Sequence, residues 1–348
     1  MQHKIYTIGN NTHCKKKIKT KKSNFFKKKK IQQKKKKNKK KIKKLHIPYH
    51  TMLSILATNL KEQENFTFTF SIENNFPEIV CWNDVEYLEN KDRKVLISKG
   101  IMKFYFNAKN NAHLAIKFRC IKNINIVTRE LNATLKLESY PIDCMLPIIH
   151  ASMTPNNRFI MLLSKGMCCD LQEWKKLAKI VTYEQVITMM KSVTKALSYL
   201  QSLNLVYLDL KLENIVTDLN NHFYLIDFDT LEQAEHKEEL IFSKRGTNGL
   251  RSLEQLELKG LSISTDIFSL SIALYEFITN EGSCYYQISN FTDLNKKLCI
   301  KKLNEKTSHW LKSEQKHILK LFMAMHEYDC FKRISLPDLV IALISYDQ

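Results

Sequence analysis

Four polar residues at a fixed spacing constrain this chain more than any other feature of its sequence. Residues 207–214 read Tyr-Leu-Asp-Leu-Lys-Leu-Glu-Asn, so that Asp209, Lys211 and Asn214 lie at offsets 0, +2 and +5. Thirteen residues after the asparagine, Asp227 follows an apolar pair. Phosphoryl transfer needs a carboxylate that orients a hydroxyl, an ammonium near the moving phosphoryl group and oxygen ligands for Mg²⁺. The spacing therefore predicts a site for that chemistry.

This stretch resembles the catalytic loop and the magnesium loop of the eukaryotic protein kinase family. The resemblance continues in chain order over about residues 94–345. It implies an α+β, two-lobed protein kinase-like fold with a small strand-rich N-lobe and a larger helical C-lobe, and with ATP and Mg²⁺ in the cleft between them. The other matching segments are Leu114-Ala115-Ile116-Lys117, Gly246-Thr247, Glu254, Asp266-Ile267-Phe268-Ser269 and Arg333.

Several residues are expected at the nucleotide. In the family, the lysine of the Val-Ala-Ile-Lys strand holds the α- and β-phosphates of ATP, which implies that role for Lys117. Its expected partner is Glu130 on the helix of the small lobe, with Glu138 as the alternative. Gly100 is the one glycine that remains of the Gly-rich phosphate loop, and Asp170, just past the expected hinge, is assigned to the ribose.

The resemblance assigns the chemistry itself to four residues. Asp209 is expected to orient the attacking hydroxyl, mainly by aligning it, and Lys211 to neutralise the transferring phosphoryl group. Asn214 and Asp227 are the expected ligands of Mg²⁺. Because a lysine at position 211 is typical of members that act on serine and threonine, we predict a protein substrate that carries one of these hydroxyls.

A second group is expected to support the site. Tyr207 replaces the family's histidine, and we expect it to pack against Phe228. The remaining members are Thr247, expected to contact the catalytic aspartate or lysine, Asp266, expected to accept hydrogen bonds from the catalytic-loop backbone, and Glu254 with Arg333, expected to form a buried ion pair.

Four departures from the family pattern keep a second function open. Two glycines of the Gly-rich loop are lost, Asp229 replaces the glycine of Asp-Phe-Gly, and Leu208 replaces the arginine that reads a phosphate on the activation loop. The fourth change puts Ser252-Leu253 in place of Ala-Pro. Glycine amides approach phosphates closely, so their loss weakens or reshapes an ATP site. The prediction is an ATP-dependent serine/threonine kinase; the alternative is a pseudokinase, a nucleotide-binding or scaffolding module without turnover.

The positive charge of the chain is confined to one segment. The formal net charge is +20, and residues 15–44 contain nineteen lysines and no acidic residue, which leaves about +1 for the rest. Residues 1–44 are therefore predicted to be a disordered tail. One interpretation is a nuclear address or contact with nucleic acid or an anionic surface. The other is a compositional by-product of a proteome rich in lysine and asparagine.

Cysteine usage and hydropathy indicate an intracellular protein of the cytoplasm or nucleus. The nine cysteines form no Cys-x-x-Cys pair, which favours free thiols in a reducing compartment. The first residues lack the apolar run of a secretory signal. No uncharged apolar stretch reaches the length of a membrane span, so we predict no transmembrane segment. The oligomeric state stays open.

The predicted organisation has three parts. The tail 1–44 is followed by an extension of unknown role over 45–93 and by a kinase domain over 94–346, with an N-lobe to about 163 and a C-lobe from about 170. Alternation with period 2 predicts strands, and apolar residues three and four apart predict helices. The predicted strands are 66–70, 95–97, 102–106, 114–116 and 159–163, and the predicted helices are 124–138, 183–203, 265–278, 313–326 and 336–345.

Overall fold

The computed structural model of the chain groups residues Met1–Met52 apart from Leu53–Gln348. All residues that the structure describes belong to the second group. These residues are 66–70, 76–97, 100–110, 112–137, 143–156, 158–167, 169–178, 180–218, 220–233, 246–247, 250–257, 261–281 and 292–345. The predicted tail, Glu138 and most of the extension before residue 76 lie outside the described residues.

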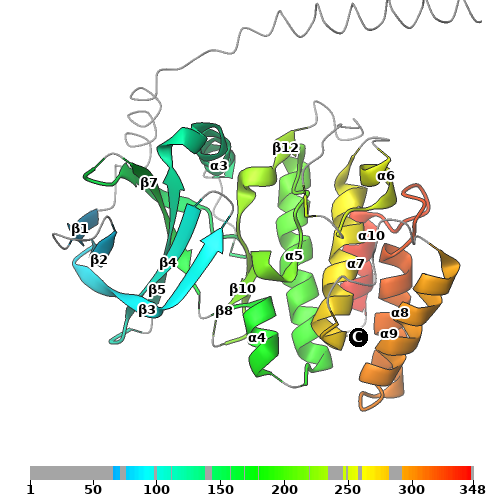
Figure 1. Ribbon diagram of the computed structural model, residues 1–348. Coiled ribbons are helices and arrows are strands. Elements are labelled where there is room, and N and C mark those ends of the chain that lie inside the picture. Colours follow the sequence, from blue (N-terminus) through cyan, green and yellow to red (C-terminus); the bar gives the residue numbers. More distant parts are fainter. Residues whose placement is uncertain are drawn as a thin grey trace, which may run out of the picture. The chain divides into compact units, whose positions relative to one another are not determined.

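A seven-stranded antiparallel sheet forms the first part of the described chain (Figure 1). Its strand order is β1-β2-β3-β4-β5-β7-β6, so only the last two strands are exchanged relative to chain order. The strands are β1 (Phe66–Phe70), β2 (Pro77–Trp82), β3 (Val85–Ile97), β4 (Gly100–Asn107), β5 (Ala112–Cys120), β6 (Ile148–Met153) and β7 (Phe159–Gly166).

Alternation along the strands gives this sheet two different faces. On one face, apolar side chains of β4, β5 and β7 build a core with β2 and the first half of β3. The core residues are Val80, Tyr87, Tyr105, Leu114, Ile116, Phe118, Met161 and Leu163. The neighbouring positions, such as Phe104, Ala115 and Leu162, line a cleft on the other face. The cleft is therefore built on strands that a packed core supports from behind.

The strands before residue 94 extend this sheet. The predicted strand at 66–70 is confirmed as β1, and it pairs with β2, which pairs with β3. The β3–β4 ladder is interrupted between Glu89 and Lys94, where β3 carries extra residues, and such an irregularity bends a strand. The Tyr105 hydroxyl donates to the Pro77 carbonyl oxygen across this core (2.9 Å). The predicted domain start at 94 falls inside β3.

Helix α3 (Ile124–Leu137) connects β5 to β6, and a 3₁₀ turn, η1 (Ile121–Asn123), precedes it. Its buried side chains include Val127, Leu131 and Leu137. Leu131 follows Val127 by four residues and Leu137 follows after six, close to one and two turns of the helix, so the three share one face. Glu130 is also on this face and is 2% exposed. A buried carboxylate requires a partner, so α3 brings a charge to the cleft side of the sheet.

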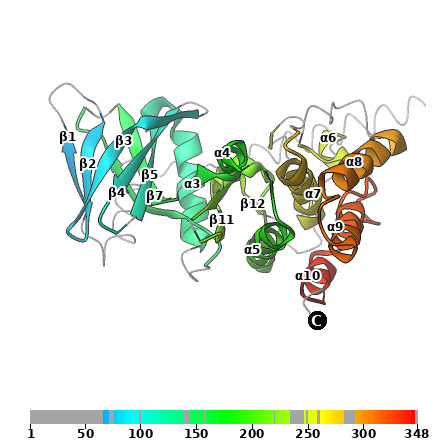
Figure 2. The ribbon, with the colours of Figure 1, turned by 90° about the horizontal axis from the view of Figure 1, so that it is seen from below.

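The second part of the described chain is mainly helical. Its helices are α4 (Leu171–Leu177), α5 (Tyr183–Ser202), α6 (Leu253–Leu256), α7 (Ile263–Thr279), α8 (Asp293–Lys306), α9 (Lys312–Met325) and α10 (Leu336–Ile344). Helix α5 begins at a capping box formed by Thr182 and Gln185, as the sequence predicts. Helix α7 is buried on nearly every side, and α5 runs beside it and α10 (Figure 2).

Short elements before α4 and between α5 and α6 carry the loops of interest. They are β8 (Cys169–Asp170), β9 (Leu205–Val206), η2 (Leu212–Asn214), β10 (Ile215–Thr217), β11 (Phe223–Leu225), η3 (Phe228–Thr230) and β12 (Glu232–Gln233). Strands β11, β10 and β8 form one small sheet, and β12 pairs with β9 in another. Among the described helices, none combines the length and the apolar character needed to cross a bilayer.

We predict that Lys175 makes the stability of the fold depend on pH. It lies in α4, is 5% exposed and donates to the carbonyl oxygen of Glu276 in α7. Burial lowers its pKa from 10.5 to about 7, with Lys306 acting in the same direction and Glu276 and Glu281 opposing. Between these two values the unfolded chain binds a proton that the folded chain lacks, so the free energy of unfolding should rise with pH.

The measurement is equilibrium urea unfolding from pH 6.5 to 9.5 for the wild type, Lys175→Met and, as a control, the exposed neighbour Lys176→Met. Relative to Lys175→Met, the wild type should gain stability with a slope approaching about 1.4 kcal/mol per pH unit. The Lys176→Met profile should run parallel to that of the wild type. Parallel profiles for all three proteins would contradict the assignment.

Candidate active site

The loop between β9 and η2 is fixed by one buried carboxylate. Asp266, at the start of α7, is fully buried, and its two oxygens accept the backbone N–H groups of Tyr207 and Leu208 (both 2.8 Å). Burial raises the pKa of Asp266 to about 7, although both backbone hydrogen bonds oppose this. Leu208 has φ +70°, a conformation that costs energy in a residue with a branched side chain. The expected contact of Asp266 is confirmed, and it holds the loop in this conformation.

This backbone conformation brings the side chains of Asp209 and Lys211 together. Their side chains form an ion pair (2.8 Å). Thr247 connects them from the activation segment, since its hydroxyl donates to Asp209 Oδ1 (2.6 Å) and accepts from Lys211 Nζ (2.9 Å). The predicted contact of Thr247 therefore occurs with both residues.

Gly246, the residue before that threonine, makes this approach possible. It has φ +92°, and a Cβ atom there would lie 2.4 Å from the carbonyl oxygen of Leu208. Only glycine combines that backbone angle with that closeness. The Gly-Thr pair thus packs directly on the catalytic loop, and any side chain at position 246 would push the hydroxyl of Thr247 away from the carboxylate.

Asn214 ends the loop with its amide already oriented. Its Nδ2 donates to the backbone oxygen of Asp209 (2.8 Å) and to Oδ2 of the same residue (3.1 Å). The nitrogen is used in these hydrogen bonds, so the carbonyl oxygen Oδ1 is the atom of the amide that could bind a metal ion. A neutral oxygen here and the carboxylate of Asp227 are both hard ligands, so the donor set fits Mg²⁺.

The loop that carries Asp227 is connected to the catalytic loop at several points. The Tyr207 hydroxyl donates to the carbonyl oxygen of Ile226, and its ring meets that of Phe228 edge-on at 5.9 Å, which confirms the expected packing. Thr230 Oγ1 donates to the Tyr207 carbonyl oxygen (2.8 Å). Asp227 itself adopts φ +61°. Tyrosine therefore serves in place of the family's histidine, with a hydrogen bond as well as a packing contact.

Lys117 lies between two carboxylates. Its Nζ is 2.6 Å from Glu130 Oε1 and 2.8 Å from Asp227 Oδ1, and the lysine is 9% exposed. Burial alone lowers the pKa of Lys117, but the two carboxylates outweigh it and raise the pKa above its ordinary value. In the folded state the ammonium is therefore charged at neutral pH. The expected pairing with Glu130 is confirmed.

These residues line a cleft that opens to solvent. Its walls come from β4, β5, β6 and β7 on one side and from β10, Ile226 and Asp227 on the other. Lining residues include Met102, Ala115, Lys117, Glu130, Leu162, Gly166, Met167, Asp170, Glu213, Val216 and Asp227.

Two residues assigned to the nucleotide have other roles in the fold. Asp170 borders the cleft, but its Oδ1 accepts the backbone N–H of Glu173 and caps α4 (2.8 Å). Gly100 opens β4 and pairs with Arg119 of β5. Gly100 also pairs with Ile97, the last residue of β3. Contact of either residue with a nucleotide stays a prediction.

Sequence reasoning missed Arg119, Gly166 and Glu213. Arg119 is two positions after Lys117 on β5, so period 2 places both side chains on one face, a signal that was available. Glycine is required at 166 because a Cβ would lie 2.8 Å from the Leu114 backbone on the neighbouring strand. Glu213 also borders the cleft. Apart from its position beside Asn214, nothing in the sequence predicts this location.

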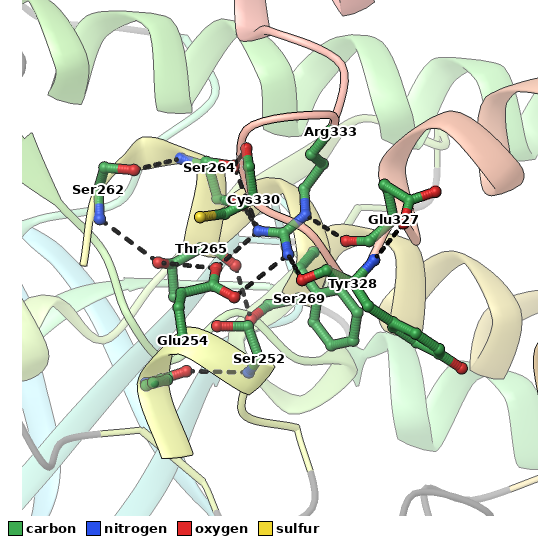
Figure 3. Close-up of polar contacts among 12 residues, drawn as sticks. Ser252, Glu254, Ser262, Ser264, Thr265, Ser269, Glu327, Tyr328, Cys330 and Arg333 are labelled. Atoms are coloured by element: carbon green, nitrogen blue, oxygen red, sulfur yellow. Dashed lines mark hydrogen bonds and ion pairs between the residues drawn. The ribbon is translucent and has the colours of Figure 1, made fainter. Parts of the chain in front are cut away.

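The far end of the activation segment is anchored by Glu254 and Arg333 (Figure 3). The two side chains form a bidentate pair, with Nη1 2.7 Å from Oε1 and Nη2 3.2 Å from Oε2. The Arg333 guanidinium also donates to the carbonyl oxygens of Ser264 and Glu327. The predicted buried pair is confirmed, and it connects α6 to α7 and to the turn before α10.

With this geometry established, comparison with known proteins identifies the family. The family described as the protein kinase domain matches residues 98–342. The chain belongs to the protein kinase family. The match begins in the turn before β4, so β1, β2 and β3 lie ahead of the family's range while sharing its sheet.

Curated relatives support the family at low identity. The putative ribosomal protein S6 kinase alpha-1 of Caenorhabditis elegans is 30% identical over 139 residues, 40% of this chain and 17% of the relative. The protein kinase C-like 1B of the same organism is 27% identical over 180 residues, 51% of this chain and 25% of the relative. The cGMP-dependent protein kinase 2 of Rattus norvegicus is 25% identical over 174 residues, which are 49% of this chain and 23% of the relative. The chain thus spans a quarter or less of these relatives.

We predict that Arg333→Met destabilises the kinase domain by about 3–5 kcal/mol, because it leaves the carboxylate of Glu254, a residue 5% exposed, without its cation. Equilibrium urea unfolding measures this loss. The control is the exposed neighbour Lys332→Met, which should change stability by less than about 1 kcal/mol. Adding Glu254→Gln to Arg333→Met should recover part of the loss, and a double variant no more stable than Arg333→Met would contradict the cause given.

Proposed function

We propose that this chain is an ATP-dependent protein kinase that transfers the γ-phosphoryl group to serine or threonine hydroxyls of proteins. The observation that carries the proposal is the joint assembly of two charge centres. Lys117 is paired with Glu130 and Asp227, and Asp209 is paired with Lys211 under Thr247. A module that only binds partners has no need to assemble both.

Each side chain has a task that its position supports. Lys117 is a buried, fixed cation at the cleft, suited to the α- and β-phosphates. Asp209 has an oxygen within reach of an incoming hydroxyl and aligns it for attack, accepting its proton late in the transfer. Lys211, beside that carboxylate, meets the charge that develops on the phosphoryl oxygens. Thr247 keeps the two at a fixed separation.

Magnesium completes the proposed site. Asn214 through Oδ1 and Asp227 through its carboxylate would hold the ion, which supplies positive charge to the phosphate oxygens when bound. Their hydrogen bonds and ion pairs described above fix both side chains beforehand. Such preorganisation lowers the cost of placing charge in the transition state.

The alternative is a pseudokinase that binds nucleotide without turnover. Two observations favour it. Val95 and Ile97 replace the first two glycines of the Gly-rich loop, and Asp229 adds a carboxylate beside Asp227. Neither observation removes a residue from the two charge centres, so we place it second. We further propose an intracellular setting with protein substrates; contact of the tail 1–44 with nucleic acid or an anionic surface stays a prediction.

Asp209→Asn should lower phosphate incorporation from radiolabelled ATP by about 10²–10⁴-fold, because the amide cannot accept the proton of the hydroxyl. The assay uses the full chain with Mg²⁺ and a generic basic protein as acceptor. Asp143→Asn is the matched control, since the side chain of Asp143 is 92% exposed. A nucleotide-dependent rise in melting temperature should persist in both variants.

Equal and negligible incorporation by folded wild type and Asp209→Asn would contradict turnover. If the melting shift with ATP persisted in that case, the pseudokinase alternative would stand instead. Loss of both incorporation and melting shift would remove ATP as the ligand.

Thr247→Val should reduce kcat by about tenfold while KM for ATP changes little. The substitution keeps the shape of the side chain but removes both its hydrogen bonds to charged groups, each worth about 1.5–3 kcal/mol. Thr247→Ser retains the hydroxyl and should restore most of the rate. Steady-state kinetics of the three proteins provide the test, and similar losses for serine and valine would mean that the methyl group matters rather than the hydrogen bonds.

A further inference from the structure

Arg119 is a buried cation that the family motifs do not account for. It lies on β5, is 2% exposed and shares the face of Lys117. Its guanidinium lies 3.6 Å from Glu130 Oε2 on α3 and 3.7 Å from Asp229 Oδ2 in η3. These distances are charge contacts, longer than hydrogen bonds. One side chain of the sheet thus faces both the helix and the magnesium loop.

Together these residues form a closed group of charges. Lys117 and Arg119 lie among Glu130, Asp227 and Asp229, whose ligand oxygens are all within 4.8 Å of one another. Three carboxylates packed so closely repel each other strongly unless cations separate them. Two cations and three carboxylates leave one net negative charge. Without Arg119, Lys117 alone would face the three carboxylates, and the net charge would become two negative.

The backbone at Asp229 does not require glycine. Asp229 lies within η3 and is absent from the residues with positive φ, so an aspartate fits there without strain. What glycine would lack is a side chain able to reach Arg119. The substitution therefore adds a contact between the magnesium loop and β5 that the family's usual residue cannot make.

We propose that Arg119 is a positioning residue, and that its guanidinium, by pairing with Asp229 and Glu130 together, holds the magnesium loop against α3 and keeps Asp227 at Lys117. The role goes beyond the proposed function, and only its kinetic readout rests on that function. Arg119 is not among the residues that line the cleft. It acts through Glu130 and Asp229.

The test is a double-mutant cycle in the full chain with Arg119→Gln and Asp229→Asn. Asparagine at 229 removes the negative charge without introducing a flexible glycine. Hydrogen–deuterium exchange of residues 226–231 is measured without nucleotide. Arg119→Gln should accelerate this exchange by about tenfold or more, the size of coupling expected between charges in contact. Asp229→Asn added to Arg119→Gln should slow it again, because the stranded carboxylate is gone. Arg119→Lys should stay near the wild-type rate.

The matched control is Arg129→Gln, an exposed arginine next to Glu130, which should leave exchange unchanged. Kinetics give a second readout, since Arg119→Gln should lower kcat/KM for ATP by about tenfold and Asp229→Asn should restore part of it. If the fold-change in exchange rate of the double variant equals the product of the two single fold-changes, the two residues act independently, and the proposal is overturned. An unchanged rate in Arg119→Gln would overturn it as well.

Two further outcomes are separable. Should Arg119→Gln fail to fold, Asp229→Asn alone decides, because an unchanged exchange rate in that variant overturns the pairing and a faster one supports it. If folded wild type transfers no phosphate, the proposed function fails while the exchange cycle still reports on Arg119. The positioning role and the catalytic activity are thus tested apart.

Discussion

The hydrogen bonds from two backbone amides to the carboxylate of Asp266 are the contact on which the site depends. They hold Leu208 at a positive φ, and that angle turns the chain so that Asp209 faces Thr247. A carboxylate buried this deeply is costly by itself, and the two N–H groups are its compensation. The same bend creates the close approach that only Gly246 tolerates. One buried acid in α7 therefore sets the positions of residues on two different loops.

A second level of order comes from charge. In many proteins a buried ion pair adds little to stability, because desolvation offsets the attraction. Here the charges connect separate elements: Lys117 and Arg119 of β5, Glu130 of α3, and Asp227 and Asp229 beside η3. An additional contact, from Lys136 Nζ to Gln233 Oε1, connects the end of α3 to β12 (2.6 Å). The value of such a network lies in fixing relative positions, and α3 is its common member.

Much of this arrangement could be predicted from the sequence, because its strongest signals are local. Asp209, Lys211 and Asn214 fall within six residues, and the buried faces of α5 and α7 follow from apolar spacing. The joining of β1 and β2 to the same sheet could not be predicted, since pairing between strands depends on register and on a bend in β3. Arg119 and Asp229 are 110 positions apart, so their contact is a product of the fold. At Asp170 the local sequence allowed two predictions, a contact with the ribose and an N-cap of the following helix, and the structure shows the N-cap.

Leu208 replaces an arginine of the family, and the change alters what holds the catalytic loop to the activation segment. The family's arginine at this position would connect the catalytic loop to a phosphate on the activation segment, and a leucine cannot make that contact. In this chain Leu208 is 2% exposed and packs with Val206 and Leu261, so the position serves the core instead. Contacts among the described residues that orient the activation segment include Thr247 to Asp209, Gly246 against Leu208, and Glu254 to Arg333. Among the described residues, the geometry of the site thus follows from packing and from fixed charges.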